Sequence, residues 1–338
     1  MSEITILPVN ENLIVTTYAN IAHLQSIFDN NYYDKYMLNN YIQLFYSYNE
    51  IDKHCFTFYA NTYETCKFVE YNTYYWGFET VDDGLINLLI EKIEEGYYII
   101  IELNELYVPN RDPYCKYHRQ HANFIYGYSK NKQIFNTKGY LDRQFIPSTI
   151  TFDEIVKAYK TIDHDLPIRF IKLNNTNYEI DWGKITYDFE EYLNSGQSEQ
   201  MHGKGVLFGI DVVSKFIGVL CNSKGGEKYN DIRPISIIKD QKNSVLKKIY
   251  KLNDMRIINL PDDSLNTFND IYNTCVQCLN LHIKYNITND SKHIMKIIDN
   301  LERIIEQERS ILPAVIKQLN EHLHKINWSK PLGFNEEK

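Results

Sequence analysis

Residues 115–137, CKYHRQHANFIYGYSKNKQIFNT, constrain the fold of this chain more than any other segment. His121 precedes an apolar run, ANFIYGY, that is typical of a buried strand. A polar turn at 129–132 follows, and a second short strand, QIFNT, carries Asn136 near its end. The segment therefore predicts an antiparallel hairpin with a histidine at its open end.

The hairpin suggests a proton-transfer site. With a two-residue turn at 130–131, odd positions of the first strand share a face with even positions of the second, which would point His121 and Asn136 the same way. An amide oxygen that accepts one imidazole N–H leaves the other ring nitrogen free to act as a base. Thr137 and Asp142 are the alternative orienting residues if the turn differs by one position. A lone histidine beside an apolar strand is more often structural, so further features are needed.

A base of this kind needs a nucleophile, and the start of a helix favours a thiolate through its unpaired N–H groups and its dipole. Residues 16–28 predict an amphipathic helix that begins at a threonine cap. Ala19 occupies the first turn, and a shifted helix would place Thr16 or Thr17 there. The expected nucleophile position therefore holds alanine.

The rest of the chain predicts an α+β fold in two regions. Residues 1–160 alternate short helices and strands, and residues 161–338 are mainly helical. Capping and periodicity predict a strand at 97–103 and helices at 82–95, 152–160, 184–194, 208–220, 236–252, 264–286 and 290–325. The Gly- and Ser-rich segment 195–209 predicts a loop.

Composition excludes several classes of protein. The net charge is −8, with no basic stripe, so nucleic acid is not an expected partner. Apolar runs are too short to span a bilayer, and the N-terminal residues do not resemble a signal peptide, which predicts a cytoplasmic protein with reduced thiols. Cys275 and Cys278 form a CxxC inside a helical pattern without a second pair. No metal and no cofactor are expected.

Several segments carry a resemblance to a known family. These are YYIIIEL, YVPNRDPYCKYHRQH, IYGY, QIF and IPSTITFDEIVKAY within 97–160, and YLNSG, VLFGIDV and DIRPISIIKDQK in the second half. Together they resemble the papain-like acyltransferases of nonribosomal peptide pathways, a group that includes the N-terminal domain of butirosin biosynthesis protein H and the amide synthase of closthioamide assembly.

The resemblance implies a papain-like cysteine-protease fold, with an N-terminal helix packed on an antiparallel sheet in residues 1–160. Residues 161–338 would complete or cover the cleft. It also implies a Cys-His-Asp/Asn site with His121 as base, and transfer of an acyl group from a carrier-protein thioester to an amine in antibiotic-type biosynthesis. The partners would be an acyl or peptidyl carrier protein bearing phosphopantetheine, and the amine acceptor.

This chain departs from the family pattern in two places. Ala19 stands at the cysteine position, and residues 1–18 contain no glutamine for an oxyanion hole, which leaves Asn12 as the candidate. Ala19 is either a Cys-to-Ala variant or the mark of a natural pseudoenzyme. Because alanine cannot attack a thioester, the chain as written is expected to be inactive. The alternatives are a non-catalytic protein that binds a carrier or peptide, and a cysteine peptidase.

Overall fold

The structure is a computed structural model that describes residues 3–49, 53–60, 62–75, 83–142, 144–162, 167–174, 179–200, 205–223 and 228–329. The chain divides into two units. Unit 1 comprises Met1–Asp34 and Asn61–Tyr178, and unit 2 comprises Lys35–Ala60 and Glu179–Lys338. The expected division at residue 160 differs from this arrangement, because the boundary falls later and an early segment belongs with the helical half.

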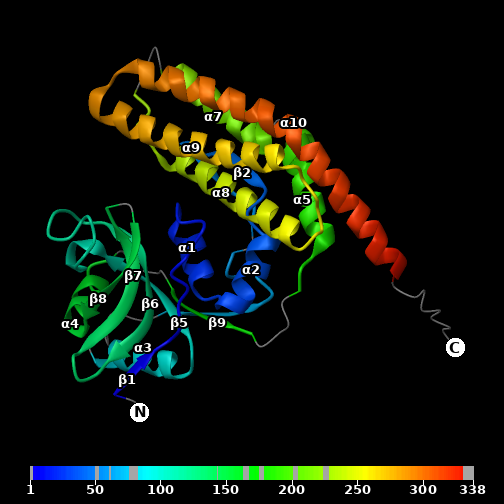
Figure 1. Cartoon of the computed structure of the whole chain (residues 1–338). Helices are drawn as coiled ribbons and strands as arrows, with labels where there is room; N and C mark the ends of the chain where they lie inside the picture. Colours follow the sequence, from blue (N-terminus) through cyan, green and yellow to red (C-terminus); the bar gives the residue numbers. More distant parts are fainter. Residues whose placement is uncertain are drawn as a thin grey trace. The chain divides into compact units, whose positions relative to one another are not determined.

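An antiparallel sheet organises unit 1 (Figure 1). The order of its strands is β4-β9-β5-β6-β7-β8, and β1 pairs with the far part of β6. The strands are β1 (Ile4–Ile6), β4 (Val69–Tyr74), β5 (Tyr98–Asn104), β6 (Gln120–Ser129), β7 (Ile134–Leu141), β8 (Gln144–Thr151) and β9 (Ile168–Leu173). Every pairing in this sheet is antiparallel. The α+β class is thus confirmed.

Helices cover both faces of this sheet. Ile125 of β6 belongs to the apolar core that α3 (Asp83–Glu94) and α4 (Phe152–Tyr159) form on one face. The neighbouring residue Phe124 stacks on His23 of α1 (Ala19–Ser26), with ring centroids 5.4 Å apart. Since successive side chains of a strand point to opposite faces, α1 lies on the face opposite α3 and α4.

The hairpin of β6 and β7 contains a bulge that sequence patterns did not predict. Its connection is longer than the expected two-residue turn, because Ser129 pairs with Ile134. Gly127 then pairs with Asn136 and Ile125 pairs with Thr137, so Tyr126 is an extra residue in β6. A one-residue bulge exchanges the faces of all side chains beyond it.

Unit 2 combines a small sheet with a helical bundle. The sheet order is β10-β2-β3, formed by Val206–Phe208, Leu44–Asn49 and Lys53–Phe58. Its helices are α2 (Asn30–Asn39), which begins in unit 1, α5 (Trp182–Asn194), α6 (Gly196–Gln200), α7 (Ile210–Asn222), α8 (Arg233–Asp254), α9 (Asp262–Thr288) and α10 (Ser291–Ser329). α10 continues through Pro313 as a single helix.

The predicted elements correspond closely to these bounds, with two corrections. The segment 195–209 is not simply a loop, since it contains α6 and β10, and residues 201–204 lie outside the described part of the chain. Helix α2, the small sheet and the strands β1, β4, β8 and β9 were given no predicted bounds. No helix among the described residues combines the length and apolarity needed to cross a bilayer.

Candidate functional site

His121 lies where β6 enters the sheet, and its position is set by β5. Leu103 of β5 pairs with His121, and Asn104 pairs with Gln120. The strand β5 is buried along most of its length, which anchors this end of β6 to the core. The His121 side chain is 26% exposed. It is thus held by a rigid strand and still reaches solvent.

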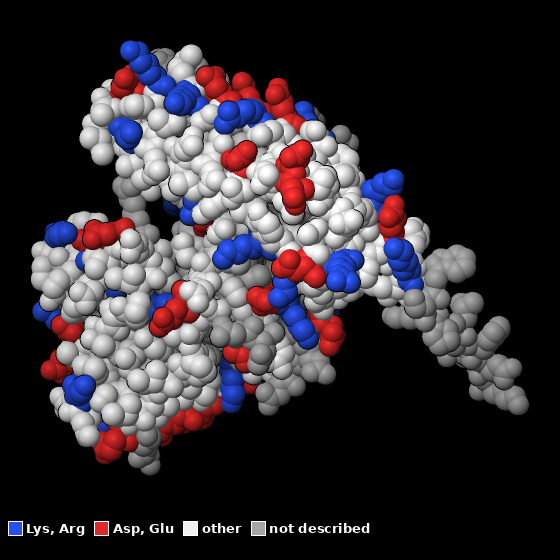
Figure 2. Space-filling model, in the orientation of Figure 1, with Lys and Arg blue, Asp and Glu red and all other residues white. Residues whose placement is uncertain are grey.

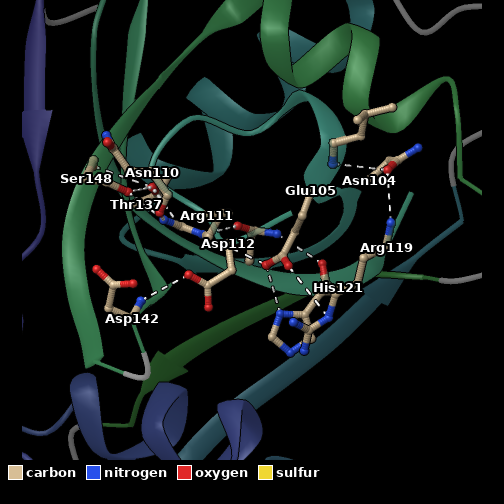
Figure 3. Close-up of polar contacts among 12 residues, drawn as sticks. Asn104, Glu105, Asn110, Arg111, Asp112, Arg119, His121, Thr137, Asp142 and Ser148 are labelled. Carbon is tan, nitrogen blue, oxygen red and sulfur yellow. Dashed lines mark hydrogen bonds and ion pairs between the residues drawn. The ribbon is translucent and has the colours of Figure 1, made fainter. Parts of the chain in front are cut away.

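The residue that orients His121 is Glu105. It is the first residue of η2 (Glu105–Tyr107), a short 3-10 helix that follows β5 directly. Its backbone N–H donates to the carbonyl oxygen of Arg119, at 2.8 Å, which extends the pairing of the two strands. Its carboxylate Oε1 lies 3.0 Å from His121 Nδ1 (Figure 3). Because a carboxylate only accepts hydrogen bonds, this contact places the proton on Nδ1, and in the neutral imidazole the lone pair is then on Nε2.

Two arginines hold the Glu105 carboxylate in place. Arg111 Nε lies 4.0 Å from Oε1, and Arg119 Nε lies 3.8 Å from Oε2. The Glu105 side chain is only 3% exposed, and that of Arg111 is fully buried, whereas that of Arg119 is half-exposed. Burial lowers the pKa of Arg111, and Glu105 opposes this effect. The two guanidinium groups therefore hold the carboxylate beside the imidazole.

Arg111 is itself fixed by neighbouring strands. Its guanidinium donates to Asn123 Oδ1 of β6, Thr137 Oγ1 of β7 and Ser148 Oγ of β8, at 3.3, 3.3 and 3.0 Å. It also packs against Gly139, where an added Cβ would lie 2.3 Å from Arg111 Nε. Figure 3 shows Thr137 and Ser148 beside the Arg111 guanidinium. Three strands therefore contribute to the position of Glu105.

The predicted orienting residue Asn136 does not lie near His121, and this prediction is corrected. Asn136 pairs with Gly127, six residues further along β6 than His121. At ~3.3 Å per residue this is about 20 Å along the strand. The expected two-residue turn would already place Asn136 opposite Ile125, four residues from His121. The longer turn adds two residues to this separation, and the bulge at Tyr126 also reverses the expected parity.

The two alternative orienting residues have other contacts. Thr137 is buried and joins the network indirectly, because it accepts from Arg111 and exchanges a hydrogen bond of 2.9 Å with Ser148. Asp142 is exposed and has φ of 48°, and its backbone N–H donates to Asp112 Oδ1 at 3.1 Å. Neither side chain has a described contact with His121. Figure 3 shows Asp142 beside Asp112, away from the imidazole.

Ala19 is the first residue of α1, and a tyrosine links this helix start to His121. The Tyr140 hydroxyl donates to the carbonyl oxygen of Thr16 at 2.6 Å. The Tyr140 ring centroid lies 6.2 Å from that of His121. Tyr18 is the N-cap of α1 and provides no side-chain cap. The sequence-predicted nucleophile position and base therefore belong to the same region of unit 1.

The segment before α1 is braced from within the helix. Gln25 Nε2 donates to the Val15 carbonyl oxygen at 2.7 Å, and Gln25 Oε1 accepts from the backbone N–H groups of Ile14 and Val15. The oxyanion candidate Asn12 is exposed, and its backbone N–H donates to Asn10 Oδ1 at 2.8 Å. Asn10 is buried. Asn12 thus has no described side-chain contact that would support an oxyanion role.

Two buried basic residues near His121 were not predicted from the sequence. His23 is fully buried, and burial together with the charges of His121, Arg111, Lys138 and Arg169 lowers its pKa well below the usual value. Lys138 is also buried, its ammonium group donates to the Asn10 carbonyl oxygen at 3.0 Å, and burial lowers its pKa. His23 follows Ala19 by four positions on α1, a spacing that could have suggested a shared helix face.

No cysteine lies within residues 3–28, which form α1 and the segment before it. Cys275 and Cys278 are buried in α9, and burial raises the pKa of both thiols, that of Cys278 to about 11. Burial also raises the pKa of Cys66. Within the described residues, no three His, Cys, Asp or Glu side chains are grouped so that they could hold a metal ion.

Comparison with family models and with curated proteins found no match. A histidine with a carboxylate on Nδ1, near a helix start, is an arrangement that can accept and return a proton during acyl transfer.

Proposed function

We propose that unit 1 is a papain-like domain that transfers an acyl group from a carrier-protein thioester to an amine. The observation that carries the proposal is the 3.0 Å contact between His121 Nδ1 and Glu105, which leaves Nε2 as a base. The placement of α1 on an antiparallel sheet, with its start linked to His121 through Tyr140, supports the papain-like fold. The orienting residue in this proposal is Glu105 instead of Asn136.

The identity of the donor follows from the proposed reaction. A thioester reacts with an amine more readily than an amide does, so a base without a strong electrophilic catalyst is sufficient. Figure 2 shows basic and acidic side chains interspersed on the face in view. This mixed surface suits a protein partner better than a nucleic acid, whose binding requires a continuous basic surface.

A second candidate function is non-catalytic binding of a carrier protein or peptide. The observation that favours it is Ala19, which cannot form a covalent bond to the substrate. A cysteine peptidase is disfavoured for the same reason. In the binding alternative, the native chain would bind an acylated carrier protein and leave its thioester intact.

Installing the thiol tests the acyl-transfer proposal. The variant Ala19→Cys is incubated with an octanoyl-phosphopantetheinyl carrier protein, and intact mass reports an octanoyl adduct on the chain. We expect an adduct, because the helix start favours the thiolate and His121 can accept its proton. The added variant His121→Gln should slow adduct formation on the order of 10²–10⁴-fold.

The matched control is Asn20→Cys, which places an exposed thiol one residue away on the same helix. It should acquire the acyl group no faster than free cysteine. The acyl-transfer proposal fails if Ala19→Cys reacts no faster than Asn20→Cys, or if its reaction does not depend on His121.

A further inference from the structure

The histidine and carboxylate of unit 1 form a complete base without any thiol. We propose that the chain with Ala19 transfers the acyl group directly from the thioester to a primary amine, with both substrates bound together and His121 as the general base. This inference rests on the proposed acyl-transfer function and deepens it. It replaces the expectation that an alanine at position 19 makes the chain inactive.

The geometry around His121 suits a proton acceptor for a substrate. Nδ1 is anchored to Glu105, and no contact of the described residues occupies Nε2. The ring is partly exposed, and Tyr140 flanks it at a centroid distance of 6.2 Å. A substrate amine can therefore approach the nitrogen that carries the lone pair.

The anchoring of Glu105 explains why His121, and not the carboxylate, would take the proton. Glu105 is buried, and its oxygens face His121, Arg111 and Arg119. Arg111 is in turn bonded to three strands, so the carboxylate cannot turn toward solvent without breaking these contacts. A carboxylate held in this way stabilises the imidazolium that forms during the reaction.

The charges of the neighbourhood favour an amine as acceptor. Several basic groups lie in this part of unit 1, because their charges lower the pKa of His23. They belong to Arg111, Lys138, Arg169 and His121. Arg169 lies 3.5 Å from Glu102, and Arg111 lies near Glu105. The charge of Glu11 acts on Lys138, but no described carboxylate lies within ion-pair distance of its ammonium group. Nearby positive charge disfavours an ammonium ion and so increases the fraction of neutral, nucleophilic amine.

The reaction balances without a covalent enzyme intermediate. The amine nitrogen attacks the thioester carbonyl carbon, and its proton passes to His121 Nε2. The tetrahedral intermediate then collapses, the C–S bond breaks, and the imidazolium returns the proton to the departing thiolate. The products are an amide and the free thiol of the carrier. Because His121 ends neutral, the site is ready for another turnover.

The test uses the unmodified chain with octanoyl- and benzoyl-phosphopantetheinyl carrier protein as donors and benzylamine and butylamine as acceptors. Amide formation is measured by mass spectrometry. We expect a rate at least ~100-fold above the buffer reaction, which is the lower range for a positioned general base. Double-reciprocal plots should intersect, and the intact chain should show no acyl adduct.

Three variants separate catalysis from structure. His121→Gln should reduce the rate to that of buffer, and Glu105→Gln should reduce kcat by on the order of 10²-fold or more because the tautomer is no longer fixed. His118→Gln is the matched control. His118 is exposed in the loop that precedes β6 and contacts Asn104 instead of Glu105, so its variant should keep the native rate.

The outcomes distinguish this inference from the function on which it rests. If Ala19→Cys acquires the acyl group but the native chain forms no amide above buffer, direct transfer is wrong and the acyl-transfer site stands. If neither reaction occurs, both proposals are wrong. Direct transfer would also be wrong if the native chain carried an acyl adduct and the double-reciprocal plots were parallel. If free acid were released in place of amide, the acceptor would be water and not an amine.

Discussion

His23 shows how one buried residue connects the packing of unit 1 to its response to pH. Its ring stacks on Phe124 and lies 5.6 Å from Phe145, and its Nδ1 is 3.3 Å from the Tyr63 hydroxyl. Nε2 is buried without a hydrogen-bond partner among the described residues. Burial, followed by the charges of His121 and the nearby basic residues, lowers the pKa of His23 well below its usual value.

This environment predicts a loss of stability in mild acid. The folded protein keeps His23 neutral, whereas the unfolded chain binds a proton below a pH of about 6.5. The unfolded state is therefore favoured as pH falls, by up to about 1.4 kcal/mol per pH unit for this group. His23→Phe keeps a ring on Phe124 and removes the titration. Urea unfolding between pH 7 and pH 5 should show a shallower decline for the variant.

The other histidines provide the internal control for this prediction. Burial also lowers the pKa of His282 and of His54, and both residues are unchanged in His23→Phe, so their contribution is common to the two proteins. Equal slopes of unfolding free energy against pH in the two proteins would show that His23 is not the group responsible.

At the scale of elements, the features that were predicted correctly depend only on residues close together in the sequence. The capping box at Thr151 and Glu154 is present at the start of α4, and the predicted strand at 97–103 is β5. The hairpin of β6 and β7 was also predicted. Its register was not, because the position of a bulge depends on pairing geometry and not on the apolar pattern.

The partner of His121 was missed for a related reason. Glu105 and His121 are sixteen positions apart, and only the pairing of β5 with β6 brings them together. The available signal was a carboxylate placed directly after a buried strand, in the sequence NELY. Without the strand pairing, that signal does not distinguish Glu105 from other acidic residues near strand ends.

A second prediction concerns Gly139, where β7 lies close to the loop that carries Arg111. Gly139→Ala would place a Cβ 2.3–2.4 Å from three atoms of the Arg111 guanidinium. The side chain must then move and lose hydrogen bonds to Asn123, Thr137 and Ser148. We expect a loss of about 1–3 kcal/mol in unfolding free energy. The displacement of Arg111 should also reduce any activity that depends on Glu105.

The matched control is Gly218→Ala in α7. Gly218 is exposed, and a Cβ added there would have no described atom within 4 Å. An alanine in a helix interior is favoured over glycine by about 1 kcal/mol, so this variant should be as stable as the native chain or more stable. If Gly139→Ala behaves like Gly218→Ala, the guanidinium does not need the space that glycine provides.

At the scale of the whole molecule, the order of the chain does not match the order of its units. Residues 35–60 belong to unit 2, where β2 pairs with β10. Tyr46 and Leu207 are partners in this ladder although they are far apart in the sequence. Periodicity and capping describe one segment at a time, so they predicted the long helices of unit 2 (α5 and α7 to α10) and could not predict this pairing.

A buried ionic cluster joins three helices within unit 2. Lys242 of α8 lies 2.7 Å from Glu308 of α10, and each side chain is 1% exposed. The Tyr192 hydroxyl of α5 donates to Glu308 Oε2 at 2.8 Å, and Lys242 also bonds to Tyr192. Burial and the Glu308 charge raise the pKa of Tyr192 well above its usual value, so the phenol stays neutral.

We predict that removing one charged member of this cluster destabilises unit 2 more than replacing all three polar side chains by apolar ones. Lys242→Met leaves the Glu308 carboxylate buried without its cation, which should cost about 3–5 kcal/mol. The triple variant Lys242→Met, Glu308→Leu, Tyr192→Phe removes every member of the cluster and should recover much of this loss, because no buried charge remains. Hydrogen exchange of amides in α5, α8 and α10 should report the difference, with amides of the unit 1 sheet as reference. The prediction is wrong if the triple variant is less stable than Lys242→Met. The remaining polar groups of the cluster would then stabilise unit 2 more than apolar side chains in their place.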